Sequence, residues 1–295
     1  EGVVSEEQRR QFSAEARFVR AYFYYWLMDQ FGGVPIVVAE GSELDFPIQP
    51  VDPNDPPERN SRREVFNFIL QELTGCTTEN FSVDDCIRNP ASGAVIPNLK
   101  TEGDVPYGRA TQGAAYALAA RMLLNAEIYT GEVTESEVST GMAMYQGAAA
   151  AADQLINSGR YRLESYFQNF ASDNQSSDEI IFSATFKADE SGAAFQQVHM
   201  SQLHYNTPGL SPWNGFTTIA EYYKSFETNE GEDGKIGTAD DVHVDKRGKS
   251  FLVGAQYQEP SSGCMGDECF SDPNSGKVTV RGEDTQLNYT LEIPG

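Results

Sequence analysis

Residues 14–35 read AEARFVRAYFYYWLMDQFGGVP, and this stretch carries the pattern that decides the fold class. From Phe12 onward, apolar and aromatic side chains recur near positions i, i+3, i+4 and i+7, which predicts one apolar face of a helix. Residues 5–8 (SEEQ) supply a capping serine and an acidic first turn. Residues 32–35 (GGVP) end the helix. We expect Trp26 in the core, on a face made of Phe12, Ala16, Val19, Tyr22, Phe23, Trp26 and Leu27.

Three further helices are predicted downstream. One follows Ser61, and two alanine-rich ones cover about residues 111–129 and 142–158. Small side chains let neighbouring helices approach closely. Pairs of amphipathic helices with small residues at the contact favour a mainly α fold of tetratricopeptide-like helical hairpins. One hairpin would span residues 111–158, and the other would join the first helix to the second. The apolar face of the second helix consists of Val65, Phe66, Ile69, Leu70 and Leu73.

The sequence changes character after Tyr161. Residues 179–183 (EIIFS) predict a short strand, and from Ala188 onward Gly, Ser, Asn and aromatic residues dominate. Helical pattern returns only at about residues 217–226. We therefore expect a helical tetratricopeptide-like scaffold over residues 1–165 and an irregular, loop-rich, partly β ligand-binding region over residues 166–295.

Composition excludes several classes of function. The 295 residues include 44 acidic and 21 basic side chains, a formal net charge of −23. Nucleic-acid binding needs clustered Lys and Arg, so no nucleic-acid partner is expected. The sequence has no nucleophile elbow, phosphate-binding loop or His-Glu-x-x-His motif, and we expect no enzyme and no required cofactor. A secreted glycoside hydrolase stays open as an alternative, because paired carboxylates can cleave glycosidic bonds.

The four cysteines form two close pairs, Cys76 with Cys86 and Cys264 with Cys269. Neither pair has the spacing of a zinc site. Two local disulfides would suit an exported protein. Four free thiols are the alternative.

Residues 229–240 (NEGEDGKIGTAD) approach the pattern of a calcium-binding loop. The template places oxygen ligands at positions 1, 3, 5 and 12 and glycine at position 6. Gly231 occupies position 3 and offers no side-chain oxygen, so a neighbouring acid would have to compensate. The alternative is an acidic, glycine-rich surface turn. The candidate calcium ligands are Asn229, Asp233, Asp240 and Asp241.

Residues 204–215 (HYNTPGLSPWNG) place aromatic side chains among amides and hydroxyls. The apolar faces of sugar rings stack on aromatic rings, while Asn, Gln and Asp hydrogen-bond to sugar hydroxyls. This composition predicts an oligosaccharide site in which Trp213 stacks on the ligand. The alternative makes Trp213 a loop anchor packed on the core. The candidate ligand-binding residues are His204, Tyr205, Asn206, Trp213, Asn214 and Phe216.

Five sequence blocks follow one another in order: residues 14–35, 108–121 (GRATQGAAYALAAR), 155–163 (LINSGRYRL), 173–182 (DNQSSDEIIF) and 245–253 (DKRGKSFLV). Together these blocks resemble the SusD/RagB family. The resemblance implies a non-catalytic lipoprotein on the extracellular face of a Bacteroidetes-type outer membrane. Such a protein captures glycans or other nutrients for a partner SusC-like TonB-dependent transporter. The family's N-terminal lipid-bearing cysteine and its C-terminal helices have no counterpart in these residues. The resemblance transfers no binding residue, and a helical scaffold that binds a protein stays open as another alternative.

Overall fold

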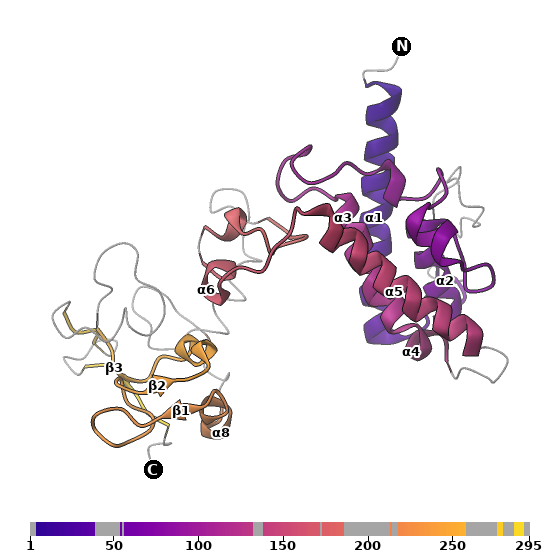
Figure 1. Ribbon diagram of the computed structural model, residues 1–295. Helices are drawn as coiled ribbons and strands as arrows, with labels where there is room; N and C mark the ends of the chain where they lie inside the picture. Colours follow the sequence, from indigo (N-terminus) through magenta and orange to yellow (C-terminus); the bar gives the residue numbers. More distant parts are fainter. Residues whose placement is uncertain are drawn as a thin grey trace. The chain divides into compact units, whose positions relative to one another are not determined.

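The computed structural model divides the chain into two compact units, each described here by itself (Figure 1). Unit 1 comprises Glu1–Glu164 and Gln175–Thr185, and unit 2 comprises Ser165–Asn174 and Phe186–Gly295. No helix among the described residues is both long enough and apolar enough to cross a membrane. The described residues are 4–38, 54, 56–131, 138–171, 173–185, 213, 218–257, 276–279 and 286–291, with backbone alone for 138–141.

The first two predicted helices are confirmed, and both begin at a serine. Helix α1 (Glu6–Phe31) is capped by Ser5, whose hydroxyl accepts a hydrogen bond from the Gln8 N–H at 3.2 Å. The Gln8 side chain accepts one from the Ser5 N–H at 2.9 Å in return. Helix α2 (Arg62–Thr74) begins with the same reciprocal pair between Ser61 and Glu64. Such capping boxes satisfy backbone N–H groups that a helix start would leave unpaired.

Helix α1 is apolar on two opposite faces, and the predicted core face is the wrong one. The side that packs on the rest of unit 1 is no more than 5% exposed at each of its residues, which are Ala14, Phe18, Ala21, Tyr25 and Met28. Trp26 is 38% exposed, so its expected place in the core is wrong. Both faces satisfy the helical period, so periodicity alone could not choose between them. Alanines on the inner face let α2 pack closely against α1. The exposed outer face carries Phe12, Val19, Phe23, Trp26 and Leu27.

Fluorescence quenching tests this placement of Trp26. The chain has two tryptophans, so the Trp213→Phe variant leaves Trp26 as the sole emitter. We expect acrylamide to quench its fluorescence readily, because the indole lies at the surface of unit 1. Blue-shifted emission that acrylamide scarcely quenches would show instead that Trp26 is buried in the core.

Helices α3 (Gln112–Leu124) and α5 (Val138–Ser158) pack along one another (Figure 1). The predicted helix over residues 111–129 is confirmed in outline but breaks at Asn125, and α4 (Ala126–Thr130) continues from there. The fully buried Ala119 and Ala151 belong to this pair, and a Cβ on Gly147 would lie 2.5 Å from the Phe81 ring. Both helical pairs, α1 with α2 and α3 with α5, are therefore those predicted from the sequence.

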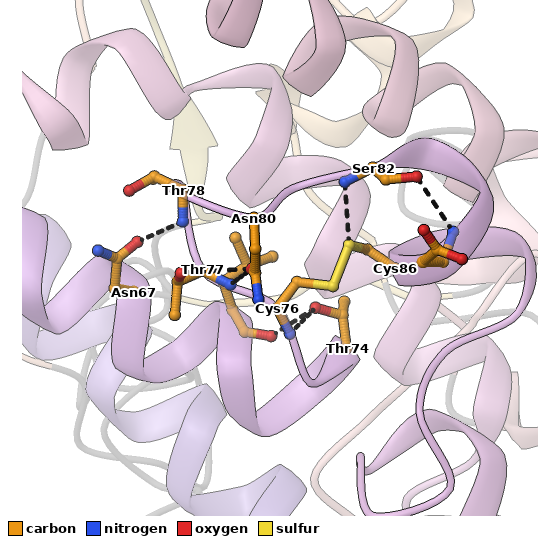
Figure 2. The surroundings of a disulfide bond; sticks show 10 residues. Asn67, Thr74, Cys76, Thr77, Thr78, Asn80, Ser82 and Cys86 are labelled. Carbon is orange, nitrogen blue, oxygen red and sulfur yellow. Dashed lines mark hydrogen bonds between the residues drawn. A yellow bond between two sulfur atoms is a disulfide. The ribbon is translucent and has the colours of Figure 1, made fainter.

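A disulfide joins Cys76 to Cys86 in the connection between α2 and α3, which confirms the predicted bond for this pair (Figure 2). Its Cα atoms are 5.9 Å apart. The enclosed loop is also held to α2 by the Thr78 N–H, which donates to the Asn67 side chain at 3.0 Å. The same connection contains two short helical turns, η1 (Asp84–Arg88), which includes Cys86, and η2 (Ile96–Asn98). Cys264 and Cys269 lie outside the described residues.

The strand expected at residues 179–183 does not form; the described segment 173–185 contains no strand. Its apolar side chain Phe182 packs instead against α1. The Phe182 ring lies edge-on to Phe18 at 5.1 Å and to Tyr22 at 5.6 Å, measured between ring centroids. A short apolar run can fill a helical core as well as a sheet, and pattern alone does not separate the two outcomes.

Unit 2 is built from short elements, which confirms an irregular, partly β region. Strand β1 (Thr228–Asn229) pairs antiparallel with β2 (Val242–His243), with Thr228 opposite His243. Strand β3 (Gly254–Ala255) pairs antiparallel with β4 (Asn288–Tyr289). Where this part of the chain is described, its helical elements are α6 (Tyr166–Asn169), η4 (Asn174–Ser176, which continues into unit 1), α8 (Ala220–Lys224) and η5 (Lys246–Ser250).

Candidate functional site

Of the six candidate ligand-binding residues, only Trp213 lies among the described residues. It is 48% exposed. The structure therefore does not test whether the six come together, and they stay a prediction. The other five are His204, Tyr205, Asn206, Asn214 and Phe216.

The predicted calcium loop connects β1 to β2 and is closed by its own hydrogen bonds. One Asp240 oxygen accepts the Asp233 N–H at 3.0 Å, and the other accepts the Thr238 hydroxyl at 2.8 Å. These bonds, the Asp233 N–H first, lower the pKa of the Asp240 carboxyl below its ordinary value. Asp241 accepts the Gly237 N–H at 2.7 Å. Three of the four candidate ligands therefore take part in the turn itself.

The setting of this loop differs from that of an EF-hand, because strands and not helices flank it. Gly231 has a steric role, since a Cβ there would lie 2.1 Å from the Asp240 carbonyl oxygen. Asn229 sits on β1 opposite Val242. Among the described residues, no group of three or more His, Cys, Asp or Glu side chains is arranged to hold a metal ion. Calcium binding here stays a prediction.

A buried polar network behind this loop was not foreseen from the sequence. His243 on β2 contacts the Thr228 hydroxyl through Nδ1 at 2.9 Å and the Tyr223 hydroxyl through Nε2 at 3.4 Å. The Tyr223 hydroxyl donates to Asp241 at 2.8 Å. Tyr223, His243 and Thr228 are all buried. The network ties α8, both strands and the acidic loop together, so His243 has a structural role. Its place between two valines, as on an alternating strand, was the available signal.

Exposed aromatic side chains are the other feature of unit 2. Tyr166 lies on α6 and Phe170 directly follows it, while Tyr222 lies on α8. These three side chains are exposed, and so is Trp213. The sequence alone did not single out Tyr166, Phe170 or Tyr222. They occur in short segments whose pattern resembles that of an ordinary buried helix face. Solvated aromatic rings on one unit provide apolar faces for a ligand.

Residues 3–124 match the sequence model of the SusD-like family described as "Starch-binding associating with outer membrane". The starch-binding protein SusD of Bacteroides thetaiotaomicron is 26% identical over 181 residues, which cover 61% of this chain and 25% of that protein. A SusD-like protein of Bacteroides ovatus is 26% identical over 231 residues, covering 77% of this chain and 36% of that one. The chain thus spans about a quarter to a third of the length of the curated relatives it matches.

Solved structures share the fold. A SusD superfamily protein from Parabacteroides distasonis superposes with a TM-score of 0.55 at 17% identity, over 99% of this chain and 54% of its own. A SusD-like carbohydrate binding protein from Bacteroides fragilis gives 0.54 at 20% identity, over 86% and 42%. The surface glycan-binding protein A of Bacteroides uniformis gives 0.51 at 18% identity, over 92% and 47%. The family match over residues 3–124, the two relatives and the shared fold agree in making this chain similar to SusD family proteins.

Proposed function

We propose that this chain belongs to a non-catalytic glycan-binding protein of the outer membrane, which captures oligosaccharide for a SusC-like TonB-dependent transporter. The observation that carries the proposal is the match of residues 3–124 to a family described as starch-binding and associated with the outer membrane. A lipid anchor on the full-length protein and a position on the extracellular face are part of the proposal.

The two units support a division of labour in this proposal. Helices α1 to α5 bury a continuous apolar core in unit 1, which suits a scaffold. Unit 2 exposes aromatic rings beside polar and charged side chains, which suits a ligand surface. Stacking and hydrogen bonding bind a sugar without breaking a bond, and uptake requires capture followed by release. We therefore assign ligand binding to residues 166–295 and the scaffold to residues 1–165.

A glycan array on the purified chain tests the proposal. We expect binding to at least one oligosaccharide, weakened about tenfold in Trp213→Ala if the indole stacks on the sugar. Failure to bind any oligosaccharide on the array would contradict glycan capture. Trp213→Phe is the matched control, because it keeps an aromatic face at the same position.

The same array, run with calcium and again with EDTA, tests the loop at residues 229–241. Weaker glycan binding in EDTA would support a calcium ion held by Asn229, Asp233, Asp240 and Asp241. Equal binding in both buffers would contradict a calcium ion that supports the glycan site.

A protein-binding scaffold is the second candidate, and the exposed outer face of α1 favours it. Phe23 and Trp26 on that face are solvent-exposed, and such apolar surface often marks a protein contact. A chain that binds no glycan but binds a protein through this face would support the second candidate over the first. Replacing Phe23 and Trp26 by glutamine separates the two, because only protein binding should then be lost.

A further inference from the structure

The outer face of α1 carries a regular exposed stripe that is apolar except at its last residue. Its members follow one another at alternating steps of four and three positions, which is the heptad spacing by which two helices pack side by side. At 1.5 Å per residue, the stripe is roughly 27 Å long. Its large apolar side chains range from 38% exposed at Trp26 to 60% at Phe23. We call it the α1 stripe, and its residues are Phe12, Ala16, Val19, Phe23, Trp26 and Gln30.

Two rings of the α1 stripe are already held in place by tyrosines of the same helix. The centroid of the Trp26 ring lies 5.7 Å from that of Tyr25 and 6.2 Å from that of Tyr22, both edge-on. The Tyr22 ring also lies edge-on to Phe23, at 6.1 Å. Because these neighbours hold the two rings, little side-chain entropy remains to be lost when another helix packs on them.

The α1 stripe is complementary to itself when two copies run antiparallel. A two-fold axis level with Ala21 brings each of the smaller apolar side chains opposite a large ring of the second copy, and such layers fill the space between two helices. A parallel pair would instead place every side chain opposite its own equivalent, with indole against indole and alanine against alanine. The antiparallel layers are Ala16 with Trp26, Val19 with Phe23 and Phe12 with Gln30.

Charge favours the same orientation. No residue of the α1 stripe is charged, so no like charges face one another between the helices. Arg9 and Arg10 share a single carboxylate, that of Glu6, whereas the last turn of α1 contains no basic residue. In an antiparallel pair these arginines lie beside the C-terminal turn of the second copy, where the helix dipole attracts cations. In a parallel pair the arginines of both copies would lie together and repel one another.

We propose that two copies of this chain associate through their α1 stripes as an antiparallel, two-fold symmetric pair of helices. A contact that uses the same patch on both copies closes on itself, so assembly stops at the dimer. The inference goes beyond the proposed function and does not depend on it, because none of the candidate ligand-binding residues lies on α1. A foreign protein on the same face, as in the second candidate function, is the competing occupant.

Sedimentation equilibrium of the full chain across the micromolar range tests the dimer. We expect a monomer–dimer equilibrium in the wild type. Phe23→Glu should raise the dimer Kd at least tenfold, because it places a carboxylate in a layer that association removes from water. Ile128→Glu is the matched control. Ile128 on α4 is 61% exposed but lies outside the α1 stripe, so this variant should dimerise like the wild type. Far-UV circular dichroism confirms that both variants are folded.

The emission of Trp26 provides a second readout. In the Trp213→Phe variant, dilute protein should show the solvent-exposed Trp26 expected above. Raising the protein concentration should shift the emission to the blue and protect it from acrylamide, because dimerisation covers the indole. An indole buried in the core of unit 1 would emit in the same way at every concentration, so the two explanations are distinguishable.

Crosslinking tests the orientation. Ala16→Cys and Trp26→Cys variants are treated with a short bismaleimide, separately and as a mixture, with the wild type as background. In the antiparallel pair, equivalent positions lie roughly 15 Å apart along the axis, so linked dimers should form mainly in the mixture. Stronger linking within each variant alone would overturn the antiparallel pairing. A wild type that stays monomeric throughout, or a dimer that Phe23→Glu does not weaken, would overturn the proposal, whatever the glycan array shows.

Discussion

Replacing Glu72 by glutamine is expected to lower the free energy of unfolding by about 3–5 kcal/mol. Glu72 on α2 is fully buried, and it pairs with two arginines of α1. Arg17 reaches it at 3.3 Å and Arg20 at 2.6 Å. Both guanidinium groups are themselves largely buried. Without the carboxylate they would lose their common counter-ion in a place that water scarcely reaches.

This ion cluster also holds the connection between α2 and α3. The Arg17 guanidinium donates to the Gly93 carbonyl at 2.6 Å, and that of Arg20 lies 5.7 Å from the centroid of the Phe68 ring. Loss of the carboxylate would therefore loosen three segments of unit 1 at once. Arg17 and Arg20 lie within residues 14–35, where the sequence alone gives no sign that these charged side chains are buried.

Urea unfolding followed by circular dichroism measures the effect of Glu72→Gln. Glu6→Gln is the matched control, because Glu6 pairs with Arg9 and Arg10 at the exposed start of α1. Surface pairs of this kind contribute little. Equally small losses of stability in the two variants would show that the buried cluster does not hold α1 on α2.

Replacing both Cys76 and Cys86 by alanine is expected to cost about 2–4 kcal/mol of stability. The disulfide joins residues 10 apart in sequence and restricts the unfolded chain more than the folded one. Both cysteines are buried beside α2, so the folded unit also loses packing when the sulfurs are removed.

Reduction of the wild type provides the control for the double alanine variant. Wild type in a strong reductant should unfold at nearly the urea concentration of that variant, while the oxidised wild type should unfold at a higher one. Peptide mapping without reduction should recover the segment around Cys76 linked to that around Cys86. Free thiols at both positions in the oxidised protein would contradict the expected bond.

Local signals in the sequence predicted the helices of unit 1 well. Ser5 and Ser61 begin α1 and α2, and Gly32 and Gly75 follow their last residues, because caps depend on a few neighbouring residues. Features that depend on contacts between distant parts of the sequence were harder to predict. Which face of α1 is buried depends on where α2 lies. The pattern around Phe182 predicted a strand, but its ring packs against α1 instead. Glu72 reads as a surface residue until its two arginines are brought to it by the fold.

The candidate site was harder to predict than the scaffold. Composition drew attention to Trp213 and its neighbours, because aromatic and amide residues cluster there in sequence. The exposed rings of Tyr166, Phe170 and Tyr222 come from short helical segments, and composition did not draw attention to them. Tyr222 and Phe226 lie four apart on a helical pattern, which is also the signature of a buried face.

We propose above all that this chain captures an oligosaccharide without cleaving it. The most direct test is calorimetric titration of the purified wild-type chain with maltoheptaose, laminarihexaose and xylohexaose as probes, followed by chromatography of the recovered sugar. We predict saturable binding of at least one probe, which is then recovered at its original length. No binding of any of the three probes would contradict capture, and recovery of shortened products would contradict a non-catalytic protein.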